Sequence, residues 1–133
     1  MEQTAYGFGQ TVRLPYEQAV ERTKEALKAE GFGILSEIDV RKTMNEKLNV
    51  EFRPYVILGA CNPPLAHKAL EAEADIGLLL PCNVVVREEA DGQSRVMAMD
   101  PEAAMGIVHS AALEQVASEA KARLQRAMVA IAG

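Results

Sequence analysis

Hydrophobic residues recur along the chain with two periods, about 3.6 residues for helices and two for strands. The clearest helical repeat lies near the C-terminus, where apolar side chains return every three or four positions from Leu113 to Ile131. The clearest strand is the nearly continuous apolar run over residues 55–61, which is typical of a strand in the interior of a sheet. The pattern predicts, in order, a strand over 4–12, a helix over 15–30, a strand over 32–40, a short helix or excursion over 41–50, a strand over 55–61, a helix over 63–74, strands over 82–86 and 95–99, and the long C-terminal helix.

Turn and cap residues separate these elements where the periods change. Asn62 and Asp100 each precede a proline, which combines an N-cap with a residue suited to the first position of a helix. Asp91-Gly92 is a hairpin signal between the last two predicted strands. The resulting β-α-β-β-α-β-β-α order predicts a single α+β domain over residues 1–133, with a mostly antiparallel sheet and helices packed on one face.

Composition and charge narrow the classes of protein. The chain has 133 residues with 49% hydrophobic and 25% charged residues, values typical of one globular domain. Its net charge is −5 and its Lys and Arg residues do not cluster, so we expect no nucleic acid and no anionic membrane surface as partner. The longest apolar run is too short to span a membrane, and no secretory signal is evident, so we expect a cytoplasmic protein.

The most suggestive chemistry lies in two Cys-Asn pairs at strand boundaries. Cys61-Asn62 ends one predicted strand and opens a helix, and Cys82-Asn83 opens the next strand. If the two strands are neighbours, two thiols and two carboxamides meet at one edge of the sheet. Cys61 also stands at a helix N-terminus, where the helix dipole favours the thiolate form.

Three interpretations of this corner remain open. In the first, both cysteines are small buried hydrophobic residues and both asparagines are caps. In the second, Cys61 is a nucleophile, Cys82 its resolving partner and His67 a base, which makes the protein a thiol-based redox protein or enzyme. In the third, Cys61, His67 and Cys82 bind a metal such as zinc or iron, or haem.

Other polar and sulfur-containing residues have simpler interpretations. His109 lies just before the long helix and is expected in the turn that leads into it. Glu88, Glu89 and Asp91 are expected in a solvated hairpin, and Asp100 is expected to act as an N-cap. The methionines are expected to fill the core.

Three stretches, residues 55–70, 76–86 and 98–101, resemble a bacterial and archaeal family known as domain of unknown function 302. The signature is carried by Cys61-Asn62-Pro63-Pro64 and by Pro81-Cys82-Asn83, and the resemblance covers essentially the whole chain. It implies a curved antiparallel sheet with helices against one face, similar to the TATA-box-binding-protein-like class, and a homodimer. It does not imply DNA binding, because that fold class hosts many functions.

The function expected from these observations is a binding module. Its site is the Cys61/Cys82 corner, with Asn62, Asn83 and His67 as further candidate residues, and its ligand is a small molecule, a metal or haem. A thiol-based enzyme with Cys61 as nucleophile is the first alternative. The second is a structural homodimer in which apolar residues of the sheet, including residues 76–80 and 84–86, pair with a second copy.

Overall fold

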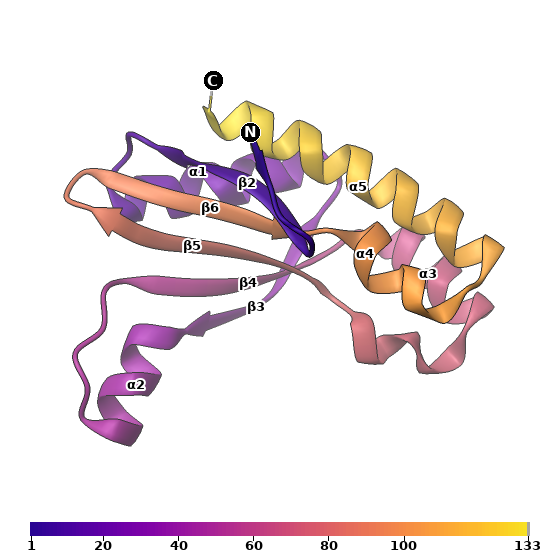
Figure 1. Ribbon diagram of the computed structural model, residues 1–133, viewed down its shortest axis with the longest axis horizontal. Helices are drawn as coiled ribbons and strands as arrows, with labels where there is room; N and C mark the ends of the chain where they lie inside the picture. The colour runs from indigo at the N-terminus through magenta and orange to yellow at the C-terminus, as the bar shows by residue number, and fades with distance from the viewer. Residues whose placement is uncertain (133) are drawn as a thin grey trace.

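A computed structural model of the protein describes residues 1–132 and contains one six-stranded sheet (Figure 1). The strands lie in the order β1-β2-β6-β5-β4-β3, and every neighbouring pair is antiparallel. Their bounds are β1 (Glu2–Gln3), β2 (Gly7–Val12), β3 (Gly33–Asp39), β4 (Tyr55–Cys61), β5 (Cys82–Ala90) and β6 (Gln93–Met99). The predicted antiparallel α+β fold is therefore confirmed.

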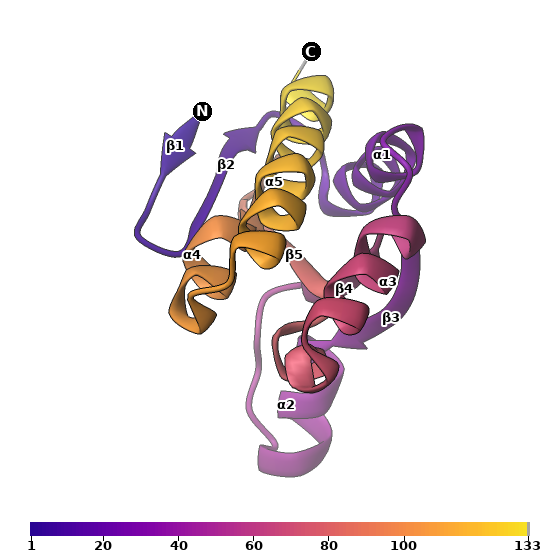
Figure 2. The same ribbon diagram turned by 90° about the vertical axis from the view of Figure 1, so that its right-hand side faces the viewer.

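The main helices cover one face of this sheet. The helical segments are α1 (Tyr16–Ala29), α2 (Val40–Leu48), α3 (Pro63–Ala72), η1 (Ala74–Leu79), α4 (Pro101–Met105), η2 (Gly106–Val108) and α5 (Ala111–Ala132). Helices α1 and α5 pack against each other on the sheet, while α3, η1 and α4 gather around the first half of α5 (Figure 2). Helix α2 projects from the opposite end of β3 and β4 (Figure 1). Within residues 1–132, no helix combines the length and apolar character that crossing a bilayer requires.

The local signals in the sequence produce the predicted boundaries. Asn62 caps α3 through its Oδ1, which accepts a hydrogen bond from the backbone N–H of Leu65 at 3.3 Å. The Oδ1 of Asp100 accepts hydrogen bonds from two backbone N–H groups in the first turn of α4. Gly92 has a φ of 74° in the hairpin between β5 and β6, a conformation that favours glycine.

Two predictions near the N-terminal half need correction or refinement. The strand predicted over 4–12 is two strands, because Thr4 Oγ1 accepts a hydrogen bond from Gly7 N–H at 3.0 Å and closes a turn between β1 and β2. Tyr6 lies in that turn and is exposed, so it does not share a face with the buried Phe8. The segment over 41–50, predicted as a short helix or an excursion, forms helix α2.

The buried side chains form two separate clusters. The sheet core joins the sheet to α1 and to the second half of α5, and consists of Phe8, Val12, Ala19, Ala26, Leu27, Phe32, Val56, Leu58, Ala60, Cys82, Val84, Val86, Val96, Ala98, Leu124, Ala127, Met128 and Ile131. The end core joins α3, η1 and α4 to the first half of α5, and consists of Leu65, Ala69, Ile76, Met105, Leu113, Val116, Ala117 and Ala120. Helix α5 contributes to both clusters, which explains its length.

Candidate functional site

A cavity of about 300 Å³ lies between the sheet core and the end core. The end of β4, the start of β5, α3, η1, α4 and α5 all contribute to it. Its lining carries no charged side chain, and Asn62 supplies its one carboxamide. The lining residues are Phe32, Leu35, Ala60, Cys61, Asn62, Leu65, Ala66, Ala69, Leu70, Gly77, Leu80, Pro81, Cys82, Met105, Val116 and Ala120.

Small side chains and one irregular strand keep this space open. Several lining positions on facing elements are alanine, and Gly77 on η1 has no atom within 4 Å of where a Cβ would stand. The pairing of β3 with β4 shifts between Ile34 and Ser36, so Leu35 is an extra residue in a β-bulge. Leu35 is 69% exposed and lines the cavity, and Leu70 on α3 is also exposed beside it. Helix α3 buries Leu65 and Ala69 and leaves Leu70 at the rim of the cavity.

Both cysteines line the cavity, as the sequence suggested for neighbouring strands. Cys82 is buried and Cys61 is half-buried, and both thiols are free. Cys82 pairs with Ala60, the residue before Cys61, so the two cysteines are offset by one position between the neighbouring strands.

Burial governs the acidity of both thiols. It raises the pKa of Cys82 to about 11, with a smaller contribution from the nearby Cys61, and it raises the pKa of Cys61 as well. This direction is opposite to the effect expected from the helix N-terminus at Cys61. Both thiols are therefore protonated at neutral pH, in which form they behave as small hydrophobic groups.

His67 lies away from the two cysteines. Its side chain is 76% exposed, and its Nδ1 is 3.5 Å from Oε1 of Glu71 on the outer face of α3. A helix that turns Leu65 and Ala69 inward turns a residue midway between them outward. Within residues 1–132, no group of three or more His, Cys, Asp or Glu side chains is placed to hold a metal ion, so the predicted Cys61/His67/Cys82 set is not assembled.

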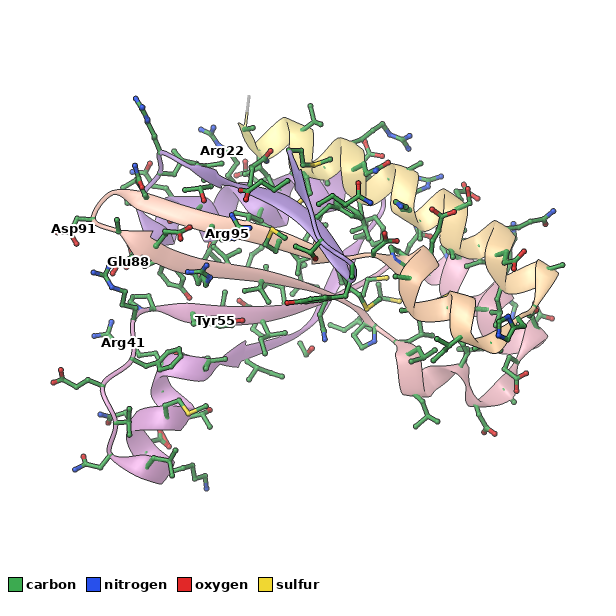
Figure 3. All side chains as sticks on the ribbon, in the orientation of Figure 1. Arg22, Arg41, Tyr55, Glu88, Asp91 and Arg95 are labelled. Atoms are coloured by element: carbon green, nitrogen blue, oxygen red, sulfur yellow. The ribbon has the colours of Figure 1, made fainter. Side chains whose placement is uncertain are left out.

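The two asparagines lie on different sides of the sheet. Asn62 lines the cavity, whereas Asn83 is exposed in a groove of about 700 Å³ on the face that α1 and α5 leave open. Tyr55 on β4 and Arg95 on β6 line the same groove (Figure 3). Because Cys82 faces the core, the next residue along β5 must face away from it. The second Cys-Asn pair is therefore divided between two surfaces.

The sequence pattern did not identify the cavity-lining residues that lie far from the cysteines along the chain. Phe32, Leu35 and Met105 reach the cavity from parts of the chain that no local pattern connects to the cysteines. A usable signal was present in the spacing of Val116 and Ala120, four residues apart on α5, since such positions share one face of a helix. Their partner across the cavity depends on how α3 docks, which periodicity does not specify.

Comparison with known proteins places the chain among uncharacterised relatives. The family model described as domain of unknown function DUF302 matches residues 8–131. The crystal structure of an uncharacterized conserved protein DUF302 from Bacillus stearothermophilus is 30% identical and superimposes with a TM-score of 0.87, covering 96% of this chain and 98% of that chain. No curated protein matches the chain.

Proposed function

The chain belongs to the DUF302 family, and from that premise we propose that it is a binding protein for a small, mainly apolar molecule held in the cavity between its two cores. The observation that carries the proposal is the cavity itself, whose lining combines about 300 Å³ of space with no charged side chain. That volume is at the lower end of the range for ligand sites, about 300–1,000 Å³.

The physical reason is the apolar surface at this end of the molecule. Apolar surface removed from water contributes roughly 25 cal/mol per Å², so a molecule that covers the cavity wall and the exposed Leu35 and Leu70 is stabilised there. The protonated state of Cys61 and Cys82 supports binding over thiol chemistry, since the thiolate is the nucleophile. Free thiols are in keeping with a reducing compartment such as the cytoplasm.

A bulky side chain added at the cavity wall tests the proposal. Gly77→Phe adds a ring at a residue that lines the cavity and has an open Cβ position, while Gly106→Phe adds the same ring at an equally open position outside the cavity. With toluene as probe, we expect saturable NMR shift changes at Ala66 and Ala120 in the natural protein and in Gly106→Phe, and their loss in Gly77→Phe. Equal toluene binding by both variants would contradict the proposal.

A second candidate function is homodimerisation through the projecting arm, residues 38–53. Helix α2 has no buried residue, and Ile38, Leu48, Val50 and Phe52 around it are exposed. The arm carries four basic and three acidic side chains, whereas the rest of the chain carries ten basic and sixteen acidic ones. The slightly basic arm of one copy therefore complements the acidic remainder of another copy.

The surface expected from the sequence, residues 76–80 and 84–86, is accessible only in part. Ile76, Val84 and Val86 are buried in the protomer, whereas Leu78 is exposed and Val85 lines the open groove. Light scattering coupled to size exclusion is expected to give a dimer for the natural protein and a monomer for Leu48→Asp combined with Phe52→Asp. A natural protein that stays monomeric at every concentration would exclude this candidate.

A further inference from the structure

The open face of the sheet carries a second recess, separate from the cavity between the two cores. It is the groove of about 700 Å³ in which Asn83 is exposed. Strands β4, β5 and β6 supply its floor, the turn between β1 and β2 supplies one wall, and α4 closes one end. The volume is well within the range of ligand sites, about 300–1,000 Å³.

Apolar side chains form most of the floor of this groove. Val85 on β5 and Met97 on β6 are partners in register, and Met99 continues the floor toward α4. All three are half-buried, although α1 and α5 cover the other face of the sheet. Ala103 and Ala104 close the end of the groove with small side chains. An apolar group placed over this floor is stabilised, because apolar surface on both sides is removed from water.

Two arginines lie at the end of the groove away from α4. Arg87 on β5 is the register partner of both Arg95 on β6 and Tyr55 on β4, so the three side chains form one row across the sheet (Figure 3). Arg87 is four residues beyond Asn83 on the same face of β5, a span of about 13 Å at about 3.3 Å per residue. Like charges directly opposite each other on neighbouring strands are destabilising, so a negative group over this row is favoured.

The two arginines differ in how far their charges are satisfied. Arg95 is 17% exposed and its Nη1 donates to Oε2 of Glu2 at 2.7 Å. Nη2 of Arg87 is 3.7 Å from Oε1 of Glu89, which is beyond hydrogen-bond distance, and the Arg87 side chain is 37% exposed. Glu89 already accepts a hydrogen bond from the hydroxyl of Thr11 at 2.9 Å. The guanidinium of Arg87 is therefore accessible to an acceptor from outside the chain.

The other charged residue of the groove lies at its opposite end and has its own partner. Asp100 is 5% exposed, caps α4, and has its Oδ2 3.0 Å from Nζ of Lys121. Between it and the arginine row the polar side chains that line the groove, Asn83 among them, are uncharged. The groove therefore has one cationic end and an apolar floor.

We propose that this groove binds an aromatic carboxylate, whose carboxylate accepts hydrogen bonds from the guanidinium of Arg87 and whose ring system covers Val85 and Met97. The guanidinium matches the geometry of a carboxylate, and methionine sulfur makes favourable contacts with aromatic rings. The site is independent of the cavity, which lies on the other side of the sheet and has no charged side chain in its lining.

Arg87→Gln tests the proposal, because it removes the charge and keeps a polar side chain. Arg22→Gln is the matched control, since it changes the net charge equally at an exposed position on α1, behind the sheet (Figure 3). The probes are 2-naphthoate and its uncharged isostere 2-naphthamide. Affinities are measured at pH 7 by NMR titration, with the methyl signals of Val85 and Met97 as reporters of the groove.

The expected result is a change in the ratio of two dissociation constants, amide over carboxylate. We expect this ratio to fall about tenfold in Arg87→Gln and to stay within twofold in Arg22→Gln. A factor of ten corresponds to about 1.4 kcal/mol, close to the contribution of one hydrogen bond to a charged group. Binding of 2-naphthoate is also expected to weaken as salt is added, whereas binding of 2-naphthamide stays constant.

Three outcomes would overturn the proposal: no binding of 2-naphthoate, an unchanged ratio in Arg87→Gln, or shift changes at Ala66 and Ala120 of the cavity instead of Val85 and Met97. None of them touches the cavity function, which the toluene experiment tests separately. Should Arg87→Gln not fold, the natural protein decides by salt dependence, which must be present for the carboxylate and absent for the amide.

Discussion

The sheet core and the end core are built along the same helix but from different side chains. The second half of α5 presents Leu124, Met128 and Ile131 to a sheet of large buried residues. Its first half presents Val116 and Ala120, which face the cavity and leave space beside α3. Large interdigitating residues hold the fold, whereas small residues at the same helical spacing leave a cavity. We therefore expect substitutions in the sheet core to act on stability and those in the end core to act first on binding.

The largest expected effect comes from the same substitution made in each core. Leu58 is fully buried in the sheet core, and Leu65 in the end core borders the cavity. We expect Leu58→Ala to lower the free energy of unfolding by about 4 kcal/mol and Leu65→Ala by about 2 kcal/mol, since a side chain beside an existing void has fewer contacts to lose. Urea unfolding of the two variants measures both values. Equal losses would remove the distinction between the cores.

The buried thiol of Cys82 gives the next effect, as a dependence on pH. The folded pKa is raised from 9.0 to about 11 by burial, so the unfolded thiol ionises first as the pH increases. The protonated Cys82 thiol therefore stabilises the folded protein. This contribution is complete below the pKa of the unfolded thiol and is lost as the pH rises from 9 to 11. We expect the natural protein to lose about 2–3 kcal/mol relative to Cys82→Ala across this window. Urea unfolding at several pH values checks this, and the half-buried Cys61 should show a smaller difference in Cys61→Ala.

The side chain of Asp100, which caps α4 and pairs with a lysine on α5, is expected to contribute less to stability. Asp100 caps α4, and its Oδ2 lies 3.0 Å from Nζ of Lys121 on α5. We expect Asp100→Ala to cost about 1–2 kcal/mol. The matched control is Asp39→Ala, which removes the cap of the exposed helix α2, and there we expect about 0.5 kcal/mol. Thermal unfolding measures both variants. A larger loss of stability in Asp39→Ala than in Asp100→Ala would mean that the arm contributes to the stability of the whole fold.

The smallest effect concerns two residues with positive φ. His109, in the turn before α5, has a φ of 57°, and Asn49 at the end of α2 has a φ of 53°. We expect His109→Gly to stabilise the protein by about 0.5 kcal/mol, because relief of the left-handed strain is partly offset by the flexibility of unfolded glycine. Asn49→Gly should change stability very little, since asparagine tolerates this conformation. Destabilisation by His109→Gly would show that the imidazole makes a contact that the end core needs.

Local physical chemistry accounts for how far the site could be predicted from sequence. The signature at Cys61-Asn62 was enough to predict a helix cap beside a thiol, and the structure has both. The same reasoning put Asn83 and His67 at the site, although strand alternation and helical phase point them elsewhere. Residues that are close along the chain were expected to have side chains close in space. This fails where a side chain points to the opposite face of its strand or helix, as those of Asn83 and His67 do.

The amino-acid sequence by itself determined the elements of this protein. Periodicity, caps and turn residues act within a few positions, so the eight buried positions of α5, the hairpin at Gly92 and the antiparallel α+β class all followed from it. Only the tertiary structure decided that a cavity exists and that Leu35 and Met105 line it. A void is a property of how distant surfaces fail to meet, and no local pattern carries that information.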